Sequence, residues 1–193
     1  IPSDGVPYPL FSFAGLVPWA YFSKAVSGAS NSLIGNTSLL SKVYFPRFII
    51  PLTPVLSGLV DFAIAFTTLV GMMVYYGAYP SFSILMVPFL VLLMMLTAYG
   101  VGGLLAALNA KYRDINHLSV FLVQLWMFIS PVVYPTSMVP EKYKFIFILN
   151  PLAGIIEGFR WALLGNIPFR AQMLACSTLV SLMLFFVGLS YFK

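Results

Sequence analysis

The stretch that decides the fold runs from Phe62 to Ala110 and reads FAIAFTTLVGMMVYYGAYPSFSILMVPFLVLLMMLTAYGVGGLLAALNA. It contains no charged residue, and the turn sequence Gly77-Ala78-Tyr79-Pro80 is its only break. A helix needs roughly 20 apolar residues to cross a hydrocarbon core about 30 Å thick. The stretch therefore predicts two membrane spans joined by a turn outside the lipid.

The composition of the whole chain agrees with a membrane protein. Hydrophobic residues make up 61% of the sequence and charged residues 8%, whereas roughly 25% of an ordinary soluble domain is charged. So few charges cannot cover a water-exposed surface, and we expect lipid around the chain. The formal net charge is +5, but the basic residues are scattered over short connections, which argues against nucleic acid as a partner.

Apolar windows of spanning length occur in five places, at residues 10–33, 50–76, 83–108, 117–134 and 171–192. Lipid offers no hydrogen bonds to the backbone, so these windows are expected to be helices. We predict an all-α fold, a polytopic helical bundle with five spans in a single transmembrane domain over residues 1–193. The chain opens on Ile1 without a signal-peptide pattern, so we also expect that an upstream part is missing.

Two short connections carry the charges that orient the bundle. The segments 36–47 and 111–117 hold Lys42, Arg47, Lys111 and Arg113, whereas residues 77–83 on the other side hold no basic residue. By the positive-inside rule the first two connections are cytoplasmic. The chain is then expected to begin outside the membrane and to end inside it.

A short helix is expected between the fourth and fifth windows, on the outer side. Asn150 is a suitable N-cap, Pro151 suits the first helical position, and Gly165 suits the end. A helix between them is about 20 Å long, too short to cross, so it should lie at the outer interface or dip into it as a re-entrant segment. Its pattern predicts close packing through Gly154 and Gly158 and an ion pair between Glu157 and Arg160 on its polar side.

Most catalytic chemistry is absent from the sequence. No Lys follows a Gly, so there is no P-loop and no ATP hydrolysis by that route. The single His117 excludes a two-histidine zinc motif, and no two acidic residues are adjacent or two apart, which removes a close carboxylate pair for a metal. No G-x-S-x-G occurs. We therefore expect no metal and no cofactor in this chain, and no enzyme activity of its own.

Several short motifs resemble one family, the permease subunits of bacterial ABC-2 type exporters of lipid-linked polysaccharide such as O-antigen, capsule or teichoic acid. The motifs lie in order over nearly the whole chain, at residues 15–19 (GLVPW), 42–47 (KVYFPR), 108–114 (LNAKYRD), 130–135 (SPVVYP) and 150–160 (NPLAGIIEGFR). The resemblance implies six spans preceded by a cytosolic amphipathic helix. It also implies a homodimeric permease in the cytoplasmic (inner) membrane that binds two copies of a separate ABC ATPase, which carries ATP and Mg.

The resemblance also implies where that ATPase binds. The loop after the family's second span is the coupling element, and here it contains Lys42, Tyr44, Phe45, Pro46 and Arg47. The alternative is a membrane-surface anchor, because aromatic and basic side chains favour that depth in any case. A second contact is expected at Arg113 and Asp114, which could equally form a solvated connection.

Two charges fall inside predicted spans. Lys24 and Asp61 each lie about ten residues from the cytoplasmic end of neighbouring antiparallel spans, so their depths coincide. An isolated charge in lipid costs roughly 3 kcal/mol, and we expect them to form an intramembrane ion pair. A gating or substrate-binding role for Asp61 is the alternative.

Aromatic residues make up 17% of the chain, and rings can stack on the apolar faces of sugars. The candidate residues for a polysaccharide conduit are Trp19, Phe22, Tyr99, Trp126 and Tyr134; the alternative is that they fill the core or the interface belts. Two other functions remain open, an ABC-2 exporter of a drug-like or lipid substrate and, less favoured, a membrane enzyme of cell-envelope assembly.

Overall fold

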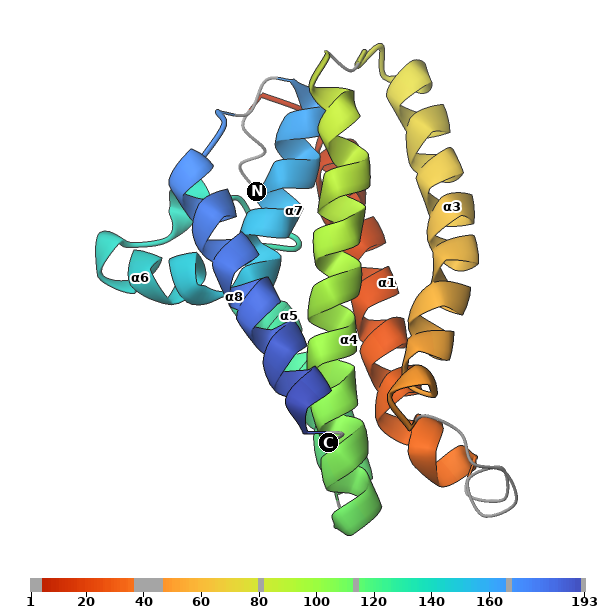
Figure 1. Cartoon of the computed structure of the whole chain (residues 1–193). Helices are drawn as coiled ribbons and strands as arrows, with labels where there is room; N and C mark the ends of the chain where they lie inside the picture. Colours follow the sequence, from red (N-terminus) through yellow and green to blue (C-terminus); the bar gives the residue numbers. More distant parts are fainter. Residues whose placement is uncertain (1–4, 37–46, 80–81, 113–114, 166–167, 192–193) are drawn as a thin grey trace.

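The computed structural model describes residues 5–36, 47–79, 82–112, 115–165 and 168–191. These residues are helical, with short turns between the helices (Figure 1). In chain order the elements are α1 (Tyr8–Gly35), η1 (Arg47–Ile49), α3 (Leu52–Tyr75), η2 (Phe82–Met86), α4 (Val87–Lys111), α5 (Ile115–Ile129), η3 (Thr136–Met138), α6 (Glu141–Leu149), α7 (Pro151–Leu164) and α8 (Ala171–Ser190). The predicted all-α class is confirmed for the described part of the chain.

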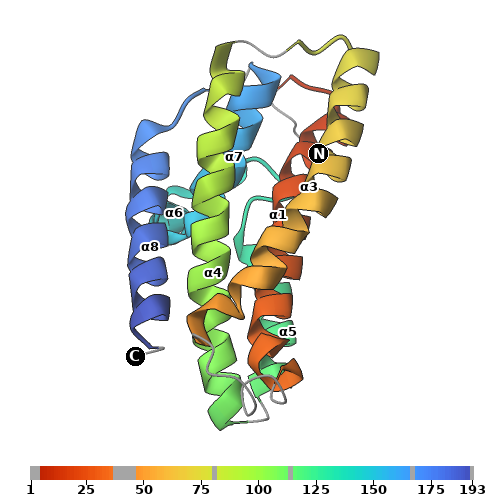
Figure 2. The same ribbon diagram turned by 45° about the vertical axis from the view of Figure 1, so that its right-hand side comes forward.

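Helix α4 is the centre of the bundle. Figures 1 and 2 show α1 and α3 on one side of it and α8 on the other. The contact with α8 is close because glycines meet there: a Cβ on Gly100 would lie 2.5 Å from the carbonyl carbon of Leu184. The end of the bundle that carries the α3–α4 connection is the predicted outer end, and the α4–α5 connection lies at the opposite, predicted cytoplasmic end.

Three of the five predicted spans are present as helices that are long and apolar enough to cross a membrane. They are Leu52–Tyr75, Phe82–Lys111 and Ala171–Ser190. Helix α1 has 28 residues, about 42 Å at 1.5 Å per residue, but its serines, Asn31 and Lys24 lower its hydropathy. Its polar residues Ser30 and Ser32 are buried against other helices rather than exposed to lipid.

The predicted fourth span, 117–134, differs from the structure. Helix α5 ends at Ile129 and has 15 residues, about 22 Å by its rise, which is shorter than the hydrocarbon core. The next residues are Ser130 and Pro131, and Pro131 has no N–H with which to continue the helix. Length and composition therefore do not confirm five spans.

The segment that follows α5 forms a bent pair of helices. Helices α6 and α7 meet at 94°, and together they are apolar and long enough to count as one broken span or a re-entrant loop. In Figure 1, α6 projects sideways from the bundle, while α7 runs among the long helices toward the outer end in both Figures 1 and 2. Nearly every residue of α7 is buried.

The core runs along α1, whose two halves have different partners. Near its start, Phe11 packs under the guanidinium of Arg160 from α7, with 3.8 Å between the charged carbon and the ring centre. Farther along, Phe22 meets Trp126 of α5 edge to face, with 5.5 Å between ring centres. Short helices α7 and α5 thus cover the outer and cytoplasmic halves of one long helix.

Candidate functional site

The N-terminus of α7 is fixed by one side chain, Asn150. Its Oδ1 accepts a hydrogen bond from the Leu152 amide at 3.1 Å, as an N-cap does, and another from Trp126 Nε1 at 3.0 Å. Its Nδ2 donates to Ser130 Oγ at 2.9 Å. The helix spans Pro151–Leu164, and Gly165 at its end has φ +68°. The predicted start and end are confirmed, and the same Asn150 also ties α7 to the end of α5.

The second fixed point of α7 is Arg160, which is fully buried. Its Nη2 donates to the Val132 carbonyl at 2.6 Å, and its Nη1 lies 3.2 Å from Glu157 Oε1 and 3.4 Å from the Tyr134 carbonyl. The ion pair follows the predicted spacing of three residues. The prediction that it lies on a polar side of the helix is wrong, because Glu157 is also buried, at 7% exposure.

This buried cluster holds three segments together. The carbonyls of Val132 and Tyr134 belong to the turn after α5, Phe11 belongs to α1, and Arg160 belongs to α7. Burying a charge costs several kcal/mol unless hydrogen bonds and an opposite charge surround it. The cluster supplies both, so the turn, α1 and α7 keep one relative arrangement.

The glycines of α7 face two different helices. A Cβ on Gly154 would lie 2.7 Å from the Met173 carbonyl oxygen of α8, and one on Gly158 would lie 2.8 Å from Leu90 Cδ2 of α4. On the facing side, a Cβ on Gly15 of α1 would lie 2.7 Å from Arg160 Nη2. The sequence pattern indicated close packing at Gly154 and Gly158 but gave no signal for Gly15.

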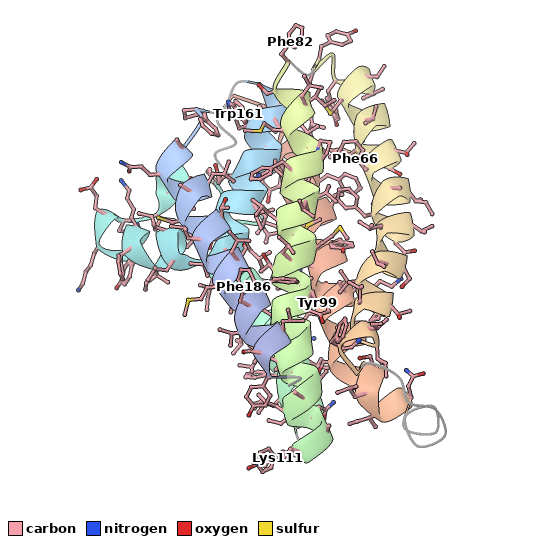
Figure 3. The ribbon with its side chains drawn as sticks, viewed as in Figure 1. Phe66, Phe82, Tyr99, Lys111, Trp161 and Phe186 are labelled. Carbon is pink, nitrogen blue, oxygen red and sulfur yellow. The ribbon has the colours of Figure 1, made fainter. Side chains whose placement is uncertain are left out.

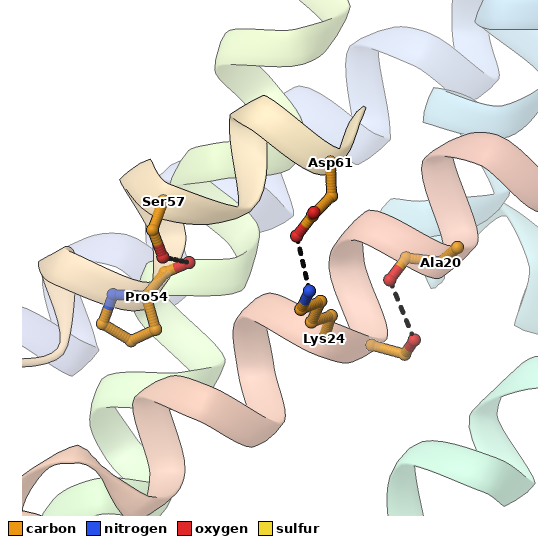
Figure 4. Close-up of polar contacts among 6 residues, drawn as sticks. Ala20, Lys24, Pro54, Ser57 and Asp61 are labelled. Atoms are coloured by element: carbon orange, nitrogen blue, oxygen red, sulfur yellow. Dashed lines mark hydrogen bonds and ion pairs between the residues drawn. The ribbon is translucent and has the colours of Figure 1, made fainter. Parts of the chain in front are cut away.

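The charged pair in the long helices lies on the surface of the chain. Lys24 Nζ of α1 lies 2.5 Å from Asp61 Oδ2 of α3 (Figure 4). The two side chains are 67% and 54% exposed. The sequence predicts this pair from the matching depths of the two residues, and the structure adds that the described helices leave both side chains exposed.

The proposed coupling residues fall mostly outside the described part of the chain. Lys42, Tyr44, Phe45 and Pro46 lie there, as do Arg113 and Asp114; Arg47 begins η1, but its side chain is not described. The described flanks of both segments lie at the predicted cytoplasmic end (Figure 1). There η1 is fixed to α4 by a 2.8 Å hydrogen bond from the Tyr99 hydroxyl to the Phe48 carbonyl.

The candidate conduit aromatics are engaged in packing within the chain. Trp19, Phe22 and Tyr99 are buried, and Tyr134 lies 6.2 Å from Phe147 between ring centres. Trp126 differs, because it also lines an apolar cavity of about 510 Å³ between α4, α5 and α6. Trp126 therefore borders open space as well as the core, and Tyr134 is also only half-buried.

Metal-binding groups are not gathered anywhere in the described ranges: no set of three or more His, Cys, Asp or Glu side chains lies close enough to hold an ion. The lone Cys176 is a half-buried residue of α8 and forms no disulfide. The features that the structure does assemble are the capped and buried helix α7, an exposed ion pair, and η1 beside the ends of α1 and α4 at the predicted cytoplasmic end.

Several known proteins are similar to this chain in sequence. The O-antigen export system permease protein RfbA of Myxococcus xanthus is 28% identical over 188 residues, which cover 96% of this chain and 72% of that protein. An RfbA of Klebsiella pneumoniae is 29% identical with the same coverage. The polysialic acid transport protein KpsM of Escherichia coli is 22% identical over 97% of this chain and 73% of its own length.

A family model matches most of the chain. It is the model described as ABC-2 type transporter, and the match covers residues 4–164, from before α1 to the end of α7. All three long apolar helices, the bent pair and the relatives' names agree with a multi-pass membrane protein. The chain belongs to the ABC-2 type transporter family.

Proposed function

We propose that this chain is the permease subunit of an ATP-driven exporter that moves lipid-linked polysaccharide across the bacterial cytoplasmic membrane. The observation that carries the proposal is the match to relatives named for O-antigen export and polysialic acid transport over 96–97% of the chain. That match includes the bent pair α6–α7 and helix α8. The chain conducts the polymer and breaks no bond itself.

Helices α1, α3, α4 and α8 each cross the membrane. The remaining span consists of α5 together with the turn at 130–134. Helix α1 can cross despite its low hydropathy, because Ser30 and Ser32 are buried within the bundle. Helix α5 reaches only about 22 Å, and the turn held by Arg160 extends its path toward the outer side. The bent pair α6–α7 then returns to the outer end without crossing.

A separate ABC ATPase supplies the energy, because the sequence contains no P-loop. In this proposal two ATPase copies dock on a homodimer of the permease. The docking surface is the cytoplasmic end, where η1 and the last turns of α1 and α4 lie (Figure 1). Movement there reaches the bundle through η1, since Tyr99 of central α4 holds the Phe48 carbonyl.

The proposal is tested by replacing Tyr44, Phe45 and Arg47 together with Ala. The matched control is Tyr75→Ala with Tyr76→Ala, because these are exposed aromatics at the outer end of α3. Two measurements are made in a host lacking its own copy: co-purification of the ATPase and display of the polymer at the cell surface. We expect the triple variant to insert normally and to lose display, while the control keeps both.

Each outcome has a distinct meaning. Loss of both ATPase binding and display places the segment in docking, and loss of display with normal binding places it in force transmission. Wild-type binding and display in the triple variant would overturn the coupling assignment. Failure of the unaltered chain to restore display, with its ATPase present, would overturn polysaccharide as the cargo and favour a drug-like or lipid substrate.

A further inference from the structure

A cavity of about 390 Å³ lies between η3, α6 and the start of α8. Its lining combines two cationic side chains, Lys144 and Arg170, with an apolar wall that includes Phe147, Phe169 and Met173. It lies where α6 projects beside the first turn of α8, in the outer half of the bundle (Figures 1 and 2). The export mechanism proposed above assigns no role to these residues.

The charges around the cavity leave it cationic. Arg170 has no ion-pair partner among the residues that the structure describes. Lys144 pairs with Glu141 at 2.9 Å, but the Glu141 side chain is 92% exposed, and an exposed pair of this kind contributes at most about 1 kcal/mol. Glu157, which lines a smaller adjoining cavity together with Arg170, is already bound to Arg160.

The apolar wall is held by contacts with α7. Met173 is buried in the α7–α8 contact, and Phe169, although 43% exposed, lies against Trp161 with 4.3 Å between ring centres and an interplanar angle of 41°. Trp161 is labelled at the outer end of α7 in Figure 3. A ligand that fits this cavity therefore has an anionic group for Lys144 and Arg170 and a hydrocarbon part for the ring and thioether surfaces.

We propose that the cavity binds the phosphate headgroup of an anionic lipid in the outer leaflet, with the first carbons of its chains against Phe147 and Phe169. Phosphate oxygens accept charge-assisted hydrogen bonds from both cations, and basic pockets between membrane helices recognise lipid headgroups in this way. The apolar wall selects the lipid over free phosphate. The inference rests on the membrane position of the chain and is independent of the cargo.

The test measures lipid binding to the full-length permease purified with its ATPase, without ATP or polymer. Native mass spectrometry follows titration with phosphatidic acid, phosphatidylcholine or inorganic phosphate. Lys144→Ala with Arg170→Ala is compared with Lys142→Ala and Lys111→Ala, which removes the same charge outside the cavity. We expect one tightly held phosphatidic acid per permease subunit, and dissociation constants about tenfold or more weaker in the first variant alone.

Comparison of the variants and of the three ligands distinguishes binding in the cavity from general attraction to anionic lipid. Retention of most of the affinity in Arg170→Lys supports the proposal, because a cation remains at the site. Equal weakening in the two double variants would overturn it, since general attraction to anionic lipid would then explain the binding. Binding of phosphatidylcholine as tight as that of phosphatidic acid, or inorganic phosphate as tight as the lipid, would also overturn it. The single variants Lys144→Ala and Arg170→Ala give the same answer if the double variant does not fold.

Discussion

Two ion pairs in this chain differ in burial, because one is enclosed by the chain and the other lies on its surface. Glu157 and Arg160 lie on one helix, are 8% and 0% exposed, and are surrounded by backbone carbonyls and the ring of Phe11. Lys24 and Asp61 join two helices and are 67% and 54% exposed. The buried pair depends on partners within the chain. The exposed pair depends on what lies outside it, because hydrocarbon does not solvate charge.

The two ion pairs connect different parts of the molecule. Arg160 connects α7, α1 and the turn after α5, so removing it disturbs three segments at once. Lys24 and Asp61 connect α1 to α3 only, and Tyr21 makes a second link there by donating to the Val55 carbonyl at 2.8 Å. Water in a conduit would solvate the exposed pair, whereas lipid or a second copy of the chain would enclose it.

The largest effect is expected from Arg160→Met. The change takes the guanidinium donor away from the buried Glu157 carboxylate and from two carbonyls, and breaking a buried ion pair costs about 3–5 kcal/mol. We expect a large fall in thermal stability of the purified protein and in the amount present in the membrane. Adding Glu157→Gln should recover a substantial part of the loss. A single variant as stable as the parent would show that the buried cluster does not hold the outer half together.

A smaller effect is expected from Gly154→Ala. The new methyl group would meet the Met173 carbonyl and the Ser177 hydroxyl of α8, and such overpacking costs about 1–3 kcal/mol. Gly71→Ala on α3 is the control, because nothing lies within 4 Å of its Cβ position and removal of a helical glycine favours folding by about 0.5–1 kcal/mol. Thermal unfolding of both variants measures the contrast. Equal shifts would mean that α7 and α8 separate easily.

The exposed pair is expected to contribute less. In a double-mutant cycle of Lys24→Ala and Asp61→Ala, we expect a coupling energy near the exposed-pair range of about 0.2–1 kcal/mol. Exchanging the two charges should restore part of the loss that either reversal alone causes. A coupling energy of about 3 kcal/mol or more would contradict the assignment of Lys24 and Asp61 as an exposed pair, because it would mean that the pair is enclosed by another chain or by lipid.

The smallest and most local effect concerns water beside the exposed pair. In a Cys176→Ala parent, Ile64→Cys lies one turn from Asp61 on the same side of α3, and Ala63→Cys lies at similar depth on the opposite side. Both positions are exposed on the single chain. We expect a charged thiol reagent to modify Ile64→Cys faster, because ionised pairs need solvation. Equally slow reaction at the two positions would place the pair in hydrocarbon.

Much of the fold follows from apolar length and from residues that begin or end helices. The spans at α3, α4 and α8 are visible as long uncharged stretches, and Asn150, Pro151 and Gly165 mark the ends of α7. Hydrophobicity could not separate a helix that faces lipid from one that is buried by other helices. The sequence therefore predicts that α7 lies at the outer interface or dips into it, with a polar side, and it extends α5 past Ser130-Pro131.

The candidate site was predictable where local spacing sets the contact. Glu157 and Arg160 are three residues apart on one helix, and Lys24 and Asp61 were paired by depth. The other partners of Arg160 come from a turn and from α1, at Val132, Tyr134 and Phe11, so no sequence spacing indicates them. The same holds for the Trp126–Asn150 hydrogen bond and for the cavity at Lys144 and Arg170, which form only when α5, α6 and α8 are in place.

The bend at Asn150 and Pro151 constrains how the protein is made. The segment from Glu141 to Leu164 carries five charged residues, Glu141, Lys142, Lys144, Glu157 and Arg160, and a charge at the centre of an inserting helix costs roughly 3 kcal/mol. These charges lie toward the two ends of the segment and leave residues 145–156, which include the bend, uncharged. Gly154 must close against α8, which follows α7 in the chain. Because the ribosome makes α8 after α7, the close contact at Gly154 forms only once α8 has been made, and we expect the bent pair α6–α7 to reach its final position during assembly of the bundle.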